Sequence, residues 1–306
     1  MTALHLGVAL PNYGAETGPG SLVEALEACE ATGVDSAWVT DHVAVDESAA
    51  PVYGTITEAL VTLGFAIGNT TRLRLGTSAL VVPQREPVLA LKQLQSLDHL
   101  SGGRLITVVA AGWLKDEFEL LGASFAGRGR RLDGWLDLVR GVQEAGPGPV
   151  TYSGIVDMDR MWLSPPAARV GGLELWGAGG SGAALRRAAR LGTWNPVAHT
   201  PDAIARAAQT LRLYRPDRPD RLHTAIVHRI GVSFADRGDE TGLDERGRPG
   251  IAGPPDWIAS GLLDHVEAGC TGFIVALDVH RPGLPARIER FTTEVWPDVL
   301  SRGGGT

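Results

Sequence analysis

The chain has 306 residues, of which 44% are hydrophobic and 21% are charged, and its formal net charge is −7. This is the composition of a globular protein with a large core, and no apolar run approaches the ~18 residues that a membrane span needs. The acidic balance, with no stretch rich in Lys and Arg, argues against a nucleic-acid partner. Residues 1–5 show neither the basic start nor the apolar run of a secretory signal, so we expect a cytoplasmic protein.

Short apolar runs alternate with helical patterns along the whole chain. The first helix is expected to open with the capping-box pair Ser21 and Glu24, and later runs repeat the same order of strand and helix. Eight such units with near-continuous apolar strands favour parallel pairing and closure into a (β/α)8 TIM barrel of the α/β class. The predicted strands are 4–10, 38–42, 73–80, 104–111, 173–177, 194–197, 223–234 and 271–277.

Two segments interrupt this alternation. Between the fourth and fifth strands, residues 146–172 are rich in Pro and Gly and predict a small hairpin around Ser153 and Gly154, laid over the barrel. A polar, glycine-rich loop over 236–255 follows the seventh strand. Neither segment has the character of a linker, so we expect residues 1–306 to form a single domain.

The loops after the strands are the predicted location of the chemistry, because barrel enzymes carry their active sites there. Asp41 and His42 end the second strand, and a histidine near its ordinary pKa of ~6.5 can pass a proton at neutral pH. A histidine in this position can equally be only a hydrogen-bonded structural residue. The other candidates by this rule are Asn12, 78–83, Gly112, Trp113, 177–182, Asn195 and 278–281.

The run Gly177-Ala178-Gly179-Gly180-Ser181-Gly182 follows a strand and opens a helix. Free N–H groups and the helix dipole would converge there on an anion, so the run predicts a phosphate site. It also spells the G-x-G-x-x-G of a dinucleotide-binding fold, but no acid occurs over 191–201, where that fold needs one. A simple tight turn between strand and helix is the remaining interpretation.

Other catalytic classes find little support. The eight histidines show no spacing typical of metal ligands, so no metal is expected. There is no G-x-S-x-G elbow, and Cys29 and Cys270 suit small buried hydrophobic positions rather than nucleophiles or a disulfide. The chemistry is therefore expected to come from a bound organic cofactor.

A series of motifs runs in one order along nearly the whole chain: 38–42; 74–80 with Pro83 and 85–87; 97–104; Gly112 and Trp113 with Glu117 and Phe118; 128–133; and 179–181 through 194–196. In this order they resemble the luciferase-like monooxygenase superfamily and, within it, the oxidoreductases that use the deazaflavin coenzyme F420. The resemblance implies that the ring lies near Asp41 and His42, with the phosphate on Gly177, Ala178, Gly179, Gly180 and Ser181.

The resemblance also implies a non-proline cis peptide between Ser78 and Ala79 that shapes the ring, His42 as proton donor or acceptor, and Asn12 and Trp113 on the substrate rim. The branch that oxidises sugar phosphates has a glutamate where this chain has Trp113, and Lys92 and Lys115 lie off the catalytic-face loops. A sugar-phosphate substrate is therefore disfavoured.

The leading hypothesis is an F420-dependent oxidoreductase that transfers a hydride to or from a small organic substrate, by C=C or C=N reduction or by alcohol oxidation. The alternative within the family is a monooxygenase that uses reduced FMN and oxygen. A cofactor-binding barrel without turnover is the non-enzymatic alternative. The resemblance further implies a homodimer, with a small molecule as partner and neither nucleic acid nor membrane.

Overall fold

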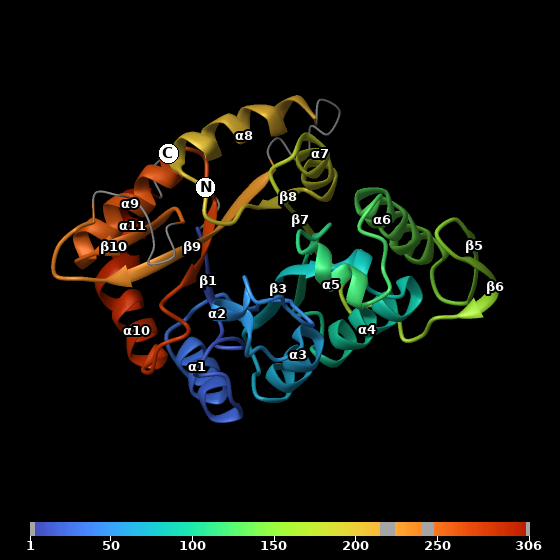
Figure 1. The fold of residues 1–306 in the computed structure, drawn as a ribbon, viewed down its shortest axis with the longest axis horizontal. Coiled ribbons are helices and arrows are strands. Elements are labelled where there is room, and N and C mark those ends of the chain that lie inside the picture. The colour runs from blue at the N-terminus through green and yellow to red at the C-terminus, as the bar shows by residue number, and fades with distance from the viewer. Residues whose placement is uncertain (1–3, 215–223, 240–247, 304–306) are drawn as a thin grey trace.

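The computed structural model describes residues 4–214, 224–239 and 248–303. Within them, eight parallel strands close into a barrel, which confirms the predicted (β/α)8 architecture (Figure 1). The strands follow the chain around the barrel, and pairing of β8 with β9 closes it. They are β1 (His5–Ala9), β2 (Ser36–Val39), β3 (Arg74–Val81), β4 (Leu105–Ala110), β7 (Leu175–Ala178), β8 (Thr193–Asn195), β9 (Ala225–Phe234) and β11 (Gly272–Ala276).

Helices surround the barrel, and several begin with proline, whose fixed φ suits the first helical turn. Such a proline starts α1 at Pro19, so the predicted capping box of Ser21 and Glu24 is wrong. Gly18 is the N-cap, and the Ser21 hydroxyl donates back to its carbonyl. The helices are α1 (Pro19–Ala31), α2 (Ala50–Tyr53), α3 (Ala59–Gly68), α4 (Pro87–Leu100), α5 (Lys115–Leu120), α6 (Arg128–Ala145), α7 (Gly182–Leu191), α8 (Pro201–Leu213), α9 (Pro255–Glu267), α10 (Leu284–Arg290) and α11 (Trp296–Gly303).

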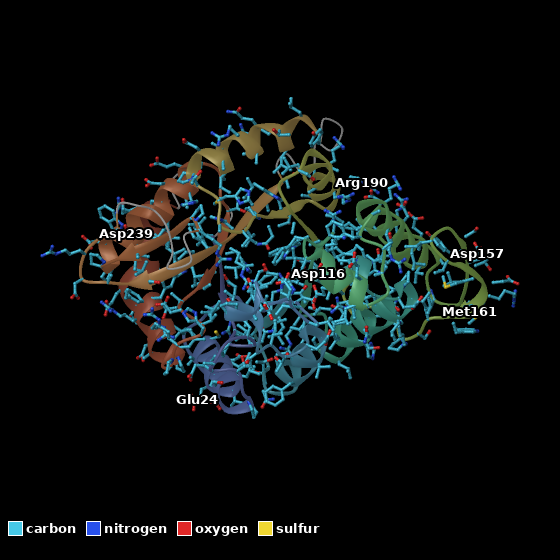
Figure 2. The ribbon with its side chains drawn as sticks, in the orientation of Figure 1. Glu24, Asp116, Asp157, Met161, Arg190 and Asp239 are labelled. Carbon is cyan, nitrogen blue, oxygen red and sulfur yellow. The ribbon has the colours of Figure 1, made fainter. Side chains whose placement is uncertain are left out.

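The Pro/Gly-rich insertion forms the predicted hairpin, in which β5 (Pro149–Ser153) pairs antiparallel with β6 (Asp157–Trp162). It does not lie over the barrel, however. Its β5 strand contacts α6, and Asp157 and Met161 project from the far edge of the molecule (Figure 2). The expected position over the barrel is therefore wrong, and the hairpin is remote from the barrel mouth.

The polar loop after β9 contains a strand that the sequence pattern did not indicate. β10 (Gly250–Gly253) pairs parallel with the second half of β9, from Gly250 opposite Gly231 to Gly253 opposite Phe234. Its four residues Gly-Ile-Ala-Gly are too short and too poor in side chains to show an alternating pattern. Residues 240–247 of the predicted loop lie outside the described part.

A plug of apolar side chains fills the barrel below its carboxyl ends: Trp38, Ile106, Val108, Trp176, Val227 and Ile274. Trp38 is fully buried, and its ring centroid lies 5.1 Å from that of Trp176. The neighbouring strands make room for its indole with glycine. A Cβ on Gly7 would lie 2.3 Å from Trp38 Nε1, and a Cβ on Gly76 would lie 2.5 Å from Trp38 Cζ3. The plug confines any ligand to the barrel mouth.

Candidate active site

The end of β2 delivers His42 to the barrel mouth, where a carboxylate fixes its ring. His42 is buried, and its Nδ1 lies 3.1 Å from Oε2 of Glu117 on α5. Because an ionised carboxylate only accepts hydrogen bonds, this contact places the proton on Nδ1. Nε2 is then the imidazole atom able to exchange a proton with a ligand.

Glu117 is held as an anion by the groups around it. Burial alone would raise the pKa of this carboxyl, but hydrogen bonds from His42, from Gln84 Nε2 at 2.8 Å and from the Val43 backbone N–H at 2.6 Å outweigh it. The pKa of Glu117 is therefore lowered below its ordinary value. The Glu117 carboxylate thus fixes the orientation of the imidazole ring.

Asp41 lies beside His42, but its carboxylate points into the scaffold. Arg85 donates to both carboxylate oxygens, at 2.7 and 2.8 Å, and the Val81 backbone N–H donates to Oδ2 at 2.8 Å. Arg85 also donates to Glu58 at 2.9 Å. Asp41 lines the cavity while its charge is already paired, so its main observed role is to fix the ends of β2 and β3.

A polar layer covers the apolar plug at the ends of β2, β3, β8 and β9. The Ser78–Ala79 peptide is cis, as the family resemblance implies. The Ser78 hydroxyl donates to Asn195 Oδ1 at 2.8 Å, and Asn195 Nδ2 donates to the Val227 carbonyl. Arg229 crosses this layer and donates to the Ser78 carbonyl and, at 2.7 Å, to the Thr40 hydroxyl.

The glycine-rich run forms the turn between β7 and α7. Gly179 has a φ of +96°, which a residue with a Cβ adopts only under strain, and Ser181 caps α7 by accepting from the Ala184 N–H. Gly177 packs against α7, because a Cβ there would lie 2.7 Å from Ala188 Cα. Gly177 thus serves helix packing, while 178–181 present backbone to the cavity.

Aromatic side chains form the wall next to His42. Trp113 is 60% exposed, and its ring meets the His42 imidazole edge to face with centroids 5.8 Å apart. On another side, the Tyr53 ring lies 4.8 Å from the same imidazole. Trp113 therefore lies on the rim, where the sequence places it.

Asn12 is not on that rim. It is fully buried, and its side-chain amide bridges β1 to β2 by accepting from the Thr40 N–H at 2.9 Å and donating to the Thr40 carbonyl at 2.8 Å. A further bond reaches the Thr57 carbonyl. With its hydrogen-bonding groups occupied by the backbone, Asn12 supports the end of β2 and does not face the cavity.

The polar layer, the glycine turn and the aromatic wall enclose one cavity of about 740 Å³, here called the mouth cavity. Of the site residues that the family resemblance implies, the structure brings all to this cavity except Asn12 and Gly177. Among the other loop candidates, Val81 and Gly112 line it, whereas Leu80, Val82, Pro83, Gly182, Asn195 and 278–281 do not. The lining residues that carry the argument are Asp41, His42, Tyr53, Ser78, Ala79, Trp113, Arg128, Ala178, Gly179, Gly180, Ser181 and Arg229.

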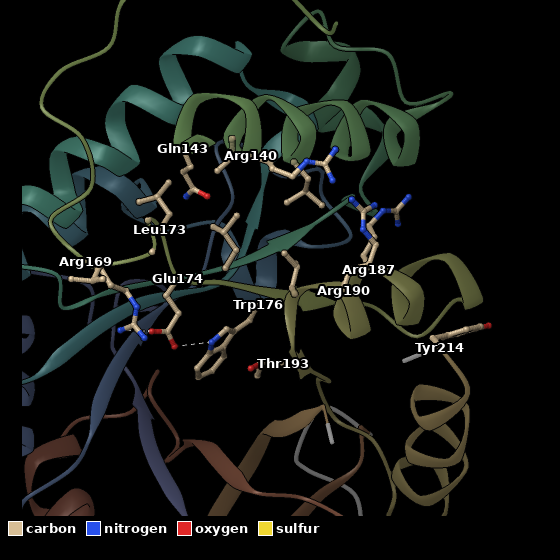
Figure 3. Close-up of a pocket in the computed structure, with 17 residues that line it drawn as sticks. Arg140, Gln143, Arg169, Leu173, Glu174, Trp176, Arg187, Arg190, Thr193 and Tyr214 are labelled. Atoms are coloured by element: carbon tan, nitrogen blue, oxygen red, sulfur yellow. Dashed lines mark hydrogen bonds and ion pairs between the residues drawn. The ribbon is translucent and has the colours of Figure 1, made fainter. Parts of the chain in front are cut away.

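Another cavity of about 770 Å³, here called the base cavity, lies at the start of β7 between α6 and α7 (Figure 3). Glu174 accepts there from Trp176 Nε1 at 3.0 Å and from Arg169 at 2.8 Å. This is the amino end of the barrel strands, where residues serve stability in barrel enzymes. The mouth cavity is thus the better candidate active site, although it is slightly smaller.

Neither a metal site nor a membrane-spanning helix occurs in the described residues. No group of His, Cys, Asp or Glu side chains in 4–214, 224–239 and 248–303 could hold a metal ion. In the same ranges, no helix is long and apolar enough to cross a membrane. Cys29 and Cys270 are free and buried as predicted, and burial raises the pKa of the Cys29 thiol to about 12.

Sequence reasoning did not assign roles to Glu117, Tyr53 and Arg229. Glu117 is 75 residues from His42, and Tyr53 lies on the four-residue helix α2, which carries no periodic signal. Arg229 lies in an apolar run, and an ionisable residue in the middle of such a run was the available signal.

Comparison with known proteins identifies the relatives. Residues 3–241 match the family model for luciferase-like monooxygenases. An uncharacterized protein of Mycobacterium tuberculosis is 29% identical over 180 residues, which are 58% of this chain and 62% of that protein. The 4-hydroxyprotoasukamycin monooxygenase of Streptomyces nodosus subsp. asukaensis is 32% identical over 129 residues, which are 42% of this chain and 33% of that protein. The matches thus span less than two thirds of these relatives.

Solved structures share the fold at low identity. An F420-dependent secondary alcohol dehydrogenase in complex with an F420-acetone adduct has a TM-score of 0.78 and 17% identity, with 98% of this chain and 99% of that chain covered. The long-chain alkane monooxygenase LadA has a TM-score of 0.79 and 15% identity, with 99% and 92% covered. Because the family model matches residues 3–241, which are most of this chain, the chain belongs to the luciferase-like monooxygenase family.

Proposed function

We propose that this protein is a coenzyme F420-dependent oxidoreductase that transfers a hydride between the deazaflavin and a small organic substrate. The reaction is the reduction of a C=C or C=N bond, or the oxidation of an alcohol. The observation that carries this proposal is the His42–Glu117 pair, which lies on the same cavity as a glycine turn suited to a phosphate. In such a site His42 can donate or accept a proton while a bound cofactor transfers the hydride.

The residues present fit such a cofactor. The turn over 178–181 presents backbone and the N-terminus of α7, which attract a phosphate. The end of β2 and the Ser78–Ala79 peptide line the position proposed for the ring. The deazaflavin would supply the hydride in the reductive direction and accept it in the oxidative one, and the protein supplies binding, orientation and exclusion of water.

His42 is the proposed proton donor or acceptor. Glu117 holds the proton on Nδ1, so Nε2 can take a proton from a substrate hydroxyl during oxidation. In the reductive direction the protonated ring gives that proton back. Tyr53 and Trp113 limit the motion of the imidazole by packing against it.

The second candidate is a monooxygenase that uses reduced FMN and oxygen. It is favoured by the family model and by the similarity to the Streptomyces monooxygenase, which matches part of this chain. The same turn would take the FMN phosphate, so the mouth cavity suits either cofactor. The pairing of Gly112 and Trp113 with Glu117 and Phe118 in the sequence favours the deazaflavin.

One titration tests the proposal. The purified protein is mixed with F420 and, separately, with FMN, and the fluorescence of each cofactor is followed. We expect F420 to bind more tightly than FMN. Tight binding of FMN alone contradicts F420 dependence and supports the second candidate. Binding of F420 without turnover of any alcohol, imine or activated alkene would support a binding barrel instead.

A further inference from the structure

Arg229 spans the inside of the barrel mouth. It leaves β9 and reaches the strands on the opposite side, where its guanidinium donates to the Ser78 carbonyl of β3 and to the Thr40 hydroxyl after β2. Its side chain lies directly above the apolar plug and forms part of the floor of the mouth cavity. The residue is only 8% exposed.

The guanidinium of Arg229 is bonded to uncharged oxygens. In the part of the chain that the structure describes, no carboxylate pairs with it, and its partners are a carbonyl and a hydroxyl. A guanidinium has five N–H donors, and these contacts use two of them. Two other largely buried arginines near the mouth are paired with carboxylates: Arg85 with Asp41 and Glu58, and Arg187, which lines the cavity, with Asp133.

A buried charge without a partner is costly, because it loses its hydration without gaining an ion pair. A cavity that retains such a charge on its floor is built to gain the missing partner from a ligand. We propose that Arg229 is a substrate-recognition residue, and that the substrate is an organic carboxylate whose anionic group binds this guanidinium. The planar fork of the remaining N–H donors matches a carboxylate better than a single-point anion.

This anion position is separate from the glycine turn. The turn follows β7, while the guanidinium of Arg229 lies at the ends of β2 and β3, and β4 separates β3 from β7. The cofactor phosphate and the substrate carboxylate can therefore be bound together, with His42 on the wall between β2 and β4. This inference rests on the proposed function in treating the mouth cavity as the chamber of the substrate.

The test uses the protein without cofactor and pairs of small probes that differ only in charge. Acetate and benzoate are compared with acetamide and benzamide at fixed ionic strength, by thermal unfolding and by quenching of tryptophan fluorescence. We expect the carboxylates to bind at least about tenfold more tightly than the amides, as a charge-assisted bidentate contact implies. Equal binding of acids and amides, or no carboxylate binding at all, would overturn the inference.

Variants test whether Arg229 is the group that binds the carboxylate probes. R229Q should abolish the preference for carboxylates, and R229K should keep a weaker one, because lysine retains the charge without the fork. Thr40→Asp places a carboxylate beside the guanidinium and should also abolish the response, without removing the arginine. R128Q is the matched control, because Arg128 lines the same cavity and donates to the Gly112 and Phe125 carbonyls. If the preference for carboxylates is lost in R128Q and retained in R229Q, Arg229 is not the residue that binds them.

Competition separates substrate from cofactor. Inorganic phosphate at saturation should leave benzoate binding unchanged, and so should bound F420 if the carboxylate position belongs to the substrate. Displacement of benzoate by either would assign Arg229 to the cofactor and refute the inference. Because the probe titrations contain no cofactor, failure of F420 binding would refute the proposed function and leave the carboxylate result intact.

Discussion

The mouth cavity and the base cavity are similar in volume and both contain arginines, but the arginines are paired differently. In the base cavity Arg169 meets Glu174 at 2.8 Å, and Arg140 and Arg190 meet Asp137 at 2.9 and 3.6 Å. In the mouth cavity Arg229 and Arg128 donate to uncharged oxygens. These base arginines each have a carboxylate partner, and the two mouth arginines have none among the residues that the structure describes.

This contrast teaches how to separate a scaffold cavity from a ligand cavity when the volumes agree. At the base, Arg190 of α7 pairs with Asp137 of α6, and Glu174 before β7 pairs with Arg169 (Figure 3). Unpaired donors at the mouth, beside a histidine oriented by Glu117, indicate binding and proton transfer. Four experiments challenge or refine this division.

The largest effect is expected from His42→Gln, with His5→Gln as its counterpart at the base, where His5 bonds to Ser36 and packs against Trp176. Loss of the proton-transferring imidazole should lower turnover by roughly 10²-fold or more while leaving the Kd of the cofactor unchanged. H5Q should turn over like the wild type. Steady-state rates measure the turnover of each variant, and cofactor titrations measure its Kd. Equal losses of turnover in the two variants would contradict the functional difference between the two cavities.

The next effect is expected from Gly179→Ala. Its φ of +96° and a Cβ 3.1 Å from Ala184 Cβ should distort the turn, weaken cofactor binding by about tenfold and cost about 1 kcal/mol of stability. Gly182→Ala is the matched control, because its nearest neighbours would be 3.7 Å away. Fluorescence titration gives both Kd values. If G182A binds as weakly as G179A, the turn is not the phosphate site.

Glu117 is expected to make the free energy of unfolding decrease at acid pH. Its pKa in the fold lies below its unfolded value of about 4.3, so its carboxylate stabilises the fold above that pH and the contribution disappears as pH falls through the folded pKa. Glu117→Gln should be less stable than the wild type at neutral pH, and the two curves should converge in acid. Urea unfolding from pH 7 to pH 3 measures this. A constant difference over the range would contradict the assignment.

The smallest effect is expected from Arg190→Gln at the base cavity. Its ion pair with Asp137 joins two side chains that are about half exposed, so the free energy of unfolding should change by no more than ~0.5 kcal/mol. Turnover and cofactor binding should not change. A clear loss of turnover in R190Q would show that the base cavity takes part in function.

The sequence predicted the barrel because its strands are continuous apolar runs at regular spacing, a local signal that survives folding. The turn over 177–182 was predictable for the same reason, because its glycines occur where the local backbone conformation favours glycine, as the positive φ of Gly179 shows. His42 was predictable because a strand ends there. These features depend on neighbours in the chain.

The remaining features depend on residues far apart in sequence. Because Asn12 follows a strand, the sequence predicted it on the rim. In the structure its side-chain amide is hydrogen-bonded to the backbone of residues 40 and 57, and these contacts exist only once the barrel has closed. The pairing of Asp41 with Arg85, and the contacts of Arg229 with uncharged oxygens instead of a carboxylate of the described residues, are likewise properties of packing. No pattern along the chain distinguishes a paired charge from an unpaired one.

The indole of Trp38 has an evolutionary consequence. Gly7 and Gly76 leave the space that it fills, and any side chain added at either position would overlap its ring. Replacing Trp38 alone would leave a hole inside the barrel, and enlarging either glycine alone would produce a clash. Gly7 and Trp38 should therefore change together among homologues. Gly76 should persist even without the tryptophan, because a Cβ there would also lie 2.8 Å from the Ile106 carbonyl oxygen.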